Sequence, residues 1–146
     1  MCWLVDKMSW ENEVEFLVLL SILFFMHKIL IVDDDHLIRM YLKTMLVDLN
    51  IRDIYEAGTR EKALNMADRY QPQVVLLDIN LPDCDGMDLL TELRTIIPDS
   101  KILMVSSEAT VDRIKVAKDR GSVGFIVKPF NAAVVFQKIK SILKDN

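Results

Sequence analysis

Five short apolar segments, separated by longer amphipathic stretches, constrain the fold more than any other feature of this chain. The segments lie at 28–33, 52–57, 73–78, 101–106 and 124–128. Three of them, KILIVD, QVVLLD and KILMVS, contain four unbroken apolar residues, which is typical of parallel strands buried on both faces. Because parallel strands need right-handed crossover connections, the pattern predicts an α/β fold with a doubly wound parallel sheet of five strands and five helices.

The amphipathic stretches each carry an apolar stripe at helical spacing. In the first stretch the stripe is Leu37, Met40, Tyr41 and Met45, and we expect this methionine-rich face to be core rather than a binding surface. The later stripes are Ala63, Leu64, Ala67 and Tyr70; Leu89, Leu90, Leu93 and Ile97; Val111, Ile114 and Ala117; and Val135, Ile139 and Ile142.

Residues 1–25 do not follow this alternation. The run FLVLLSILFFM at 16–26 is too short to span a bilayer, and the acidic residues before it do not suit a signal peptide. The run could form a helix with acidic residues near its start. Three interpretations stay open: an extension upstream of a start at Met26, an oligomerising helix, or a weak membrane contact, which the composition favours least. We therefore predict an extension of unknown role at 1–25 and one domain at 26–146, with no room for an output domain after it.

Charge and composition narrow the class of protein further. The net charge of −4 gives no footprint for nucleic-acid binding. The two cysteines, Cys2 and Cys84, lack metal-ligand spacing and suit a reducing cytosol, and the two histidines are too few for a histidine-rich metal site. We expect a cytoplasmic protein without a nucleic-acid partner, and membrane contact remains the least favoured interpretation of residues 1–25.

Polar side chains stand where four of the predicted strands end. Asp33, Asp34 and Asp35 follow the first strand, Asp78 ends the third, Ser106 the fourth and Lys128 the fifth. Ligands of an open parallel sheet bind outside the carboxyl ends of the strands, so we expect these side chains to share one crevice. Each of them alone could be a helix cap or a solvated group, and we expect Asp35 to be an N-cap.

Clustered carboxylates predict a particular chemistry. They repel one another unless a cation lies between them, and an oxygen-only ligand set favours Mg²⁺. An aspartate beside such a cation can attack phosphorus as a nucleophile and form an acyl phosphate. A lysine and a hydroxyl nearby would neutralise and hydrogen-bond the transferred group. The crevice is therefore predicted to accept a phosphoryl group.

Four motifs carry a resemblance to a known family. They are IVDDD at 31–35, LLDINLPDCDG at 76–86, LMVSSEA at 103–109 and GFIVKPF at 124–130. Together they resemble the receiver domain of two-component response regulators, most closely its single-domain chemotaxis members, over 27–146. The resemblance implies a flavodoxin-like sheet with strand order 2-1-3-4-5 and a cis bond between Lys128 and Pro129.

The resemblance also implies roles for single residues. Asp78 would be phosphorylated by a sensor histidine kinase or a phosphotransfer protein, and Mg²⁺ would be the cofactor. The implied metal ligands are Asp33, Asp34, Asp78 and the backbone carbonyl of Asn80, while Ser106 and Lys128 would bind the phosphoryl group and Ser106 and Phe125 would form the switch. Such a protein catalyses only its own phosphorylation and dephosphorylation.

A downstream target would bind the surface of the fourth helix, fifth strand and fifth helix. The basic residues expected on that surface are Arg113, Lys115, Lys118, Lys138 and Lys140.

Two other functions compete with this interpretation. A phosphatase of the haloacid dehalogenase type would need Thr or Val where Leu37 follows Asp33 and Asp35. A receiver fold used only as an interaction module would typically have lost the acidic pair, the acceptor or the lysine, and this sequence retains all three. P-loop and dinucleotide-binding folds are excluded, since the four glycines, at 58, 86, 121 and 124, form neither motif.

Overall fold

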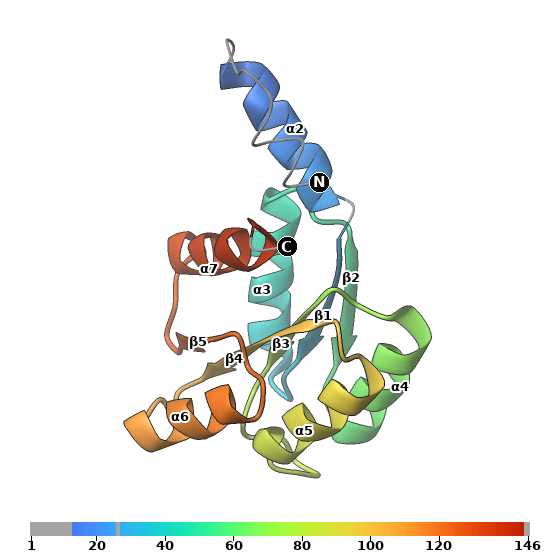
Figure 1. Cartoon of the computed structure of the whole chain (residues 1–146), viewed down its shortest axis with the longest axis vertical. Coiled ribbons are helices and arrows are strands. Elements are labelled where there is room, and N and C mark those ends of the chain that lie inside the picture. The colour runs from blue at the N-terminus through green and yellow to red at the C-terminus, as the bar shows by residue number, and fades with distance from the viewer. Residues whose placement is uncertain (1–12, 26, 145–146) are drawn as a thin grey trace.

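A five-stranded parallel sheet with helices on both faces forms the body of the protein (Figure 1). The computed structural model describes residues 13–25 and 27–144. The strand order is β2-β1-β3-β4-β5, which confirms the predicted topology. The strands are β1 (Lys28–Val32), β2 (Asp53–Ala57), β3 (Val74–Leu77), β4 (Lys101–Ser106) and β5 (Gly124–Val127).

Five helices alternate with these strands, as predicted, and a further helix precedes them. The five are α3 (His36–Asp48), α4 (Arg60–Tyr70), α5 (Gly86–Ile96), α6 (Val111–Asp119) and α7 (Ala132–Lys144). The preceding helix is α2 (Glu13–Phe25), which lies in the predicted extension and begins with Glu13 and Glu15 in its first turn. In the described part of the chain, no helix is both long enough and apolar enough to cross a membrane.

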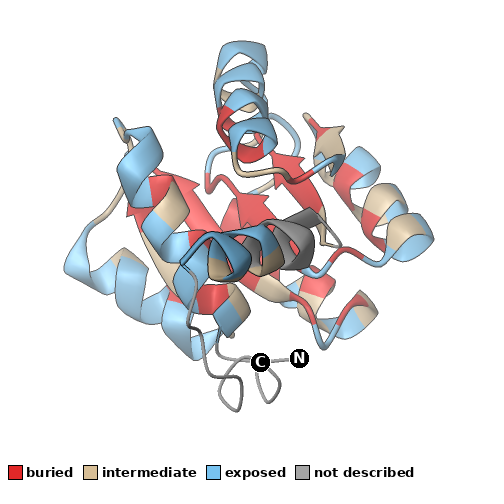
Figure 2. Cartoon of the chain, turned by 90° about the horizontal axis from the view of Figure 1, so that it is seen from above, coloured by how far each residue is buried: buried red, intermediate tan, exposed pale blue. Residues whose placement is uncertain are grey.

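The core consists of two apolar layers, one on each face of the sheet. On one face α4, α5 and α6 cover alternate strand residues such as Leu30 and Val32. On the other face α3 and α7 cover the residues between them, such as Ile29 and Ile31. Figure 2 shows the result: the inner strands β1, β3 and β4 are almost wholly buried and the edge strands β2 and β5 only partly, while most helices are buried on one side and exposed on the other. Double coverage explains why the strand segments read as unbroken apolar runs.

Short polar side chains begin four of the helices. The backbone N–H of Leu37 donates to the Asp35 carboxylate over 2.9 Å, so Asp35 is the N-cap of α3 as predicted. Thr59, Asp85 and Thr110 cap α4, α5 and α6 in the same way. Each cap satisfies a backbone donor that the helix itself leaves unpaired and contributes about 1 kcal/mol.

The prediction of which apolar stripe of α3 faces the core is wrong. Leu37, Met40 and Tyr41 are 65%, 50% and 47% exposed, and of the predicted stripe only Met45 is buried. The helix instead turns a neighbouring stripe toward the sheet, formed by Ile38, Leu42, Met45, Leu46 and Leu49. Two apolar stripes lie side by side on this helix, and periodicity does not distinguish the one that faces the core.

The predicted stripe of α6 also needs correction. Val111 and Ile114 are exposed, and Ala117 is the residue of this helix that is buried against the sheet. Helix α6 therefore joins the core cluster on its face of the sheet through this one small side chain.

Gly86, the first residue of α5, fixes how closely this helix approaches the end of β3. Its N–H donates to the backbone carbonyl of Ile79 over 2.6 Å. A Cβ added at this position would lie 2.1 Å from the carbonyl oxygen of Asp78 and 2.6 Å from the Cα of Ile79. Real Cβ atoms do not approach backbone so closely, so any side chain here must displace α5 or the loop before it.

We predict that Gly86→Ala lowers the free energy of unfolding by about 2 kcal/mol or more, because the backbone must shift to admit the methyl group. Urea denaturation of both proteins measures the loss. Thr95→Ala is the matched control, since Thr95 is exposed on the same helix. Equal stability of Gly86→Ala and the control would contradict the close approach.

Candidate functional site

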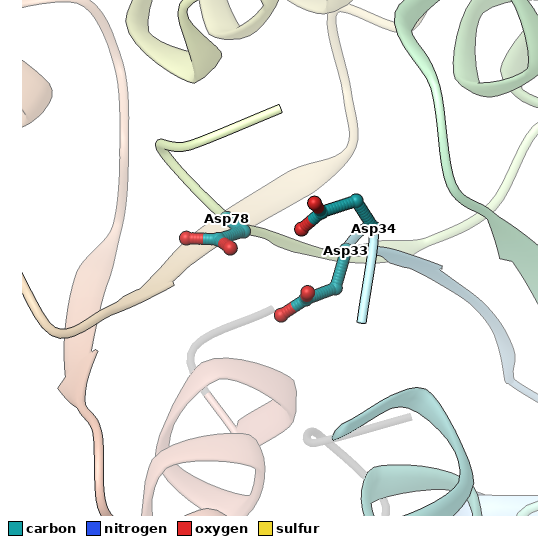
Figure 3. Close-up of side chains that lie close together, drawn as sticks. All are labelled: Asp33, Asp34 and Asp78. Atoms are coloured by element: carbon teal, nitrogen blue, oxygen red, sulfur yellow. The ribbon is translucent and has the colours of Figure 1, made fainter. Parts of the chain in front are cut away.

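Three carboxylates converge at the carboxyl end of the sheet (Figure 3). Asp33 and Asp34 directly follow β1, and Asp78 directly follows β3, the neighbouring strand. One carboxylate oxygen from each of the three residues lies within 4.8 Å of the others. Asp33 and Asp78 are buried, whereas Asp34 is exposed. The predicted acidic cluster therefore exists, and one member faces solvent.

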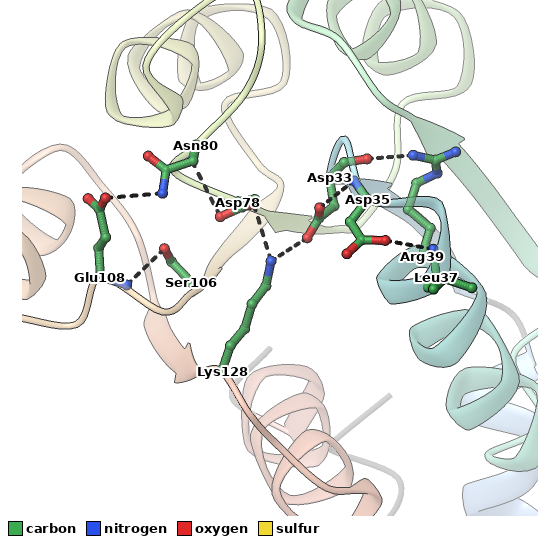
Figure 4. A network of polar contacts seen from close by, with 9 residues as sticks. All are labelled: Asp33, Asp35, Leu37, Arg39, Asp78, Asn80, Ser106, Glu108 and Lys128. Atoms are coloured by element: carbon green, nitrogen blue, oxygen red, sulfur yellow. Dashed lines mark hydrogen bonds and ion pairs between the residues drawn. The ribbon is translucent and has the colours of Figure 1, made fainter.

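Lys128 joins the cluster from the far edge of the sheet. It directly follows β5, and its peptide bond to Pro129 is cis, as predicted. Its ammonium nitrogen lies 2.6 Å from Asp33 Oδ2 and 3.2 Å from Asp78 Oδ2, so one cation bridges both buried carboxylates (Figure 4). These two partners are 95 and 50 residues away in sequence.

Burial and the neighbouring charged groups have opposing effects on the pKa values of Asp33 and Lys128. Burial raises the pKa of Asp33 above its ordinary value, and the hydrogen bond from Lys128 only partly offsets that rise. Burial would also lower the pKa of Lys128, but its hydrogen bond to Asp33 and the charges of Asp33 and Asp78 outweigh burial and raise it. Lys128 is therefore a firmly protonated cation, while an uncompensated negative charge on Asp33 is costly.

The residues at this site fit Mg²⁺. Among residues 13–25 and 27–144, the group at this site consists of three carboxylates with no thiol or imidazole, a hard oxygen donor set that Mg²⁺ prefers. The exposed side of Asp34 leaves room for the water ligands that this ion keeps. Added positive charge would also offset the repulsion from Asp78, which adds to the effect of burial in raising the pKa of Asp33. The backbone carbonyl of Asn80 remains a predicted ligand, and the N–H of the same residue donates to Asp78 Oδ1 over 3.4 Å.

A hydrogen-bonded chain connects the loops after β3 and β4. The side-chain amide of Asn80 donates to Glu108 over 3.1 Å, and the backbone N–H of Glu108 donates to Ser106 Oγ over 3.2 Å. Ser106 is fully buried at the end of β4, beside the end of β3. Figure 4 shows this chain on the side of Asp78 opposite Asp33. The predicted hydroxyl therefore lies next to the acceptor strand, held by its own loop.

Phe125 lies farther from the carboxylates than the other predicted residues. It is the second residue of β5, in register with Met104 of β4, whereas Lys128 follows the end of the same strand. Its ring is partly buried against the cluster covered by α4, α5 and α6.

Sequence reasoning missed two residues that hold the site together. Arg39 donates to the backbone carbonyl of Asp33 over 2.7 Å and pairs with Glu56 of β2. Glu108 connects Asn80 to Ser106, as described above. Arg39 follows Asp33 by six residues, on the second turn of the helix after it, and that spacing is the only signal in the sequence. Glu108 has no comparable signal.

Comparison with known proteins agrees with this fold and site. Residues 29–140 match the family described as the response regulator receiver domain, and the chain belongs to that family. The family consists of signalling proteins of two-component systems rather than classical enzymes.

Individual relatives are chemotaxis proteins. The chain is 36% identical over 119 residues to chemotaxis protein CheY-3 of Vibrio cholerae, covering 80% of this chain and 92% of that protein. It is 32% identical over 119 residues to chemotaxis protein CheY of Listeria monocytogenes, covering 82% of this chain and all 100% of that protein.

Solved structures show the same fold. A CheY-like receiver domain protein from Methanospirillum hungatei superimposes with a TM-score of 0.77 at 30% identity, over 82% of this chain and 94% of that one. A two-component response regulator from Clostridium difficile gives a TM-score of 0.77 at 28% identity, over 81% and 96% of the two chains.

We predict that Mg²⁺ raises the melting temperature of this protein, because an ion that binds only the folded state stabilises it by mass action. Asp34→Asn should remove most of that rise, since it deletes one ligand from the cluster. Thermal unfolding with MgCl₂ and with chelator measures both effects at constant ionic strength.

Asp35→Asn is the matched control for this experiment. It changes the same charge one residue further on, and Asn caps a helix as well as Asp does. The control should keep the full Mg²⁺ effect. Equal losses in the two variants would mean that the ion responds to net charge rather than to this cluster.

Proposed function

We propose that the protein is a response regulator that accepts a phosphoryl group on Asp78 in a Mg²⁺-dependent reaction. The observation that carries the proposal is the position of the Asp78 carboxylate. Its Oδ2 lies 3.2 Å from the Lys128 ammonium, and one of its oxygens lies within 4.8 Å of an oxygen of each of the two other carboxylates in the cluster. The donor would be a histidine of a sensor kinase or of a phosphotransfer protein, as the family resemblance implies.

In this reaction one oxygen of Asp78 attacks phosphorus as the bond to the donor histidine breaks. The histidine nitrogen leaves with the electron pair of that bond, and an acyl phosphate forms. Lys128 then neutralises the new charge, for which its position beside Asp78 is suited. Mg²⁺, held by Asp33, Asp34 and Asp78, would supply positive charge to the phosphoryl oxygens.

The switch that reads this modification begins at Ser106. Its hydroxyl would turn toward the phosphoryl group, and its loop, which Glu108 now holds, would move inward with it. Phe125 would then bury more of its ring in the space that the loop leaves. Fuller burial of the ring would favour the phosphorylated state by ~1–2 kcal/mol, which changes a two-state equilibrium roughly five- to thirtyfold.

The output surface in this proposal consists of α6, β5 and α7. Lys115, Lys118, Lys138 and Lys140 are exposed on these helices, and they favour an acidic peptide or helix as the target. Arg113 contributes less than the sequence suggested, because it lies 3.5 Å from both Asp85 and Glu108. A cytoplasmic location belongs to the same proposal, since a kinase and a target would meet the protein there.

We predict that acetyl phosphate and Mg²⁺ add one phosphoryl group to the protein and that Asp78→Asn abolishes the addition. Intact-mass analysis detects the product. Asp99→Asn is the control, because Asp99 is exposed in the turn before β4, at the opposite end of the sheet. Undiminished labelling of Asp78→Asn would refute the assignment, as would equal labelling in chelator.

We predict that beryllofluoride, which mimics the phosphoryl group, shifts amide resonances in α6 and at Phe125 as well as around Asp78. Ser106→Ala should keep the shifts around Asp78 and lose those at Phe125, because the hydroxyl couples the two. Two-dimensional NMR of isotope-labelled protein measures both. If the wild-type shifts stop at the loops around Asp78, the switch does not operate.

A further inference from the structure

Helix α2 is apolar on every side. Between Phe16 and Phe25 every residue except Ser21 is apolar, and the two charged residues of the helix, Glu13 and Glu15, lie in its first turn. Leu17 and Val18 are 54% and 52% exposed. Figure 1 shows α2 leading away from the sheet at the end opposite the carboxylate cluster. A helix without a polar face is normally buried, and Leu17 and Val18 offer exposed apolar surface for a partner to cover.

A membrane does not provide that surface well. With 13 residues, α2 is shorter than the roughly 20 residues that span a bilayer. A helix lying in the membrane interface needs a polar face, commonly rich in Lys and Arg, and α2 has neither. Its charged residues are acidic, and anionic headgroups would repel them. Another protein surface is therefore the better partner.

We propose that α2 pairs antiparallel with α2 of a second copy of this chain. Charge complementarity selects both the partner and the orientation. Glu13 and Glu15 lie at the start of the helix, and Lys28 follows its end at the first residue of β1. Antiparallel pairing places the glutamates of one copy beside Lys28 of the other, and it also opposes the two helix dipoles. Parallel pairing would bring the four glutamates together instead.

The same orientation separates the two domains. Each domain follows the end of its own α2, so an antiparallel pair holds the domains at opposite ends of a helix about 20 Å long. The midpoint between positions 13 and 28 falls at residues 20 and 21, so an antiparallel pair places position 21 close to position 21 of the second copy. Helices of this length bury less than a standard interface of ~1,600 Å², so we expect a dissociation constant in roughly the micromolar range.

This association is independent of the proposed phosphotransfer. Helix α2 connects to the amino end of β1, whereas the carboxylates follow its carboxyl end. The five residues of β1 separate the two by about 16 Å. A dimer through α2 would leave the crevice open in both copies.

Sedimentation equilibrium of the full chain over a range of concentrations tests the pairing. We expect a monomer–dimer equilibrium, and we expect Leu17→Glu to raise its dissociation constant at least tenfold. Val111→Glu is the matched control, because Val111 is an 82% exposed apolar residue on α6. A wild-type monomer at all concentrations, or a dimer lost in the control and kept in Leu17→Glu, would overturn the proposal.

Disulfide cross-linking tests the orientation in a Cys2→Ser, Cys84→Ser background. Ser21→Cys should cross-link under mild oxidation, and Val14→Cys should not, because an antiparallel pair places residue 14 opposite the far end of the helix. Cross-linking through both positions would indicate a parallel pair and overturn the proposal. In the same assay Glu15→Lys should weaken the dimer, and adding Lys28→Glu should restore it.

Vesicles separate this association from membrane contact. The full chain should stay in the supernatant when vesicles of neutral or anionic phospholipid are pelleted. The proposal would be overturned if the wild-type chain pelleted with either kind of vesicle while Leu17→Glu stayed in the supernatant. That result would mean that α2 binds lipid.

Discussion

The rest of the site depends on the ion pairs between the ammonium group of Lys128 and the carboxylates of Asp33 and Asp78. Parallel strands end at the same edge of a sheet, so the residues after β1 and β3 necessarily bring two buried carboxylates together. Burial raises the cost of their charges, and the ammonium of Lys128, which directly follows β5, offsets that cost at distances of 2.6 and 3.2 Å. The strand order thus creates the repulsion and also supplies the cation that opposes it.

The same arrangement makes the crevice responsive to charge. A metal ion and a phosphoryl group would both change the electrostatic balance at Asp78. Hydrogen bonds connect Asp78 and its loop to a neighbouring loop, which would respond to that change. Asn80, Glu108 and Ser106 connect the acceptor loop to the loop after β4. Gly86 keeps α5 against the other side of the acceptor loop, where no side chain fits. One side of the acceptor strand is therefore tightly packed, while the other is held by polar contacts that can rearrange.

Chemistry and self-association occupy opposite ends of the molecule in our proposals. The carboxyl end of β1 carries the acidic pair, and its amino end carries α2. A central buried strand keeps these ends apart, so an event at one need not disturb the other. Two phosphoacceptor domains joined in this way would present two copies of the output surface to a target and gain affinity by multivalency.

Much of this protein follows from its sequence. Unbroken apolar runs specify buried parallel strands, and Asp35 specifies the start of a helix. The positions of Asp33, Asp34, Asp78 and Lys128 at strand ends specify one polar crevice. These features can be predicted because they depend on local pattern and on a general rule of sheet topology. Only the tertiary structure decided which stripe of α3 is core, since Leu37 and Leu42 belong to adjacent apolar stripes of equal periodicity. It also decided the positions of Arg39 and Glu108. Their contacts join separate loops and strands, and such contacts depend on how whole elements pack rather than on any spacing along the chain.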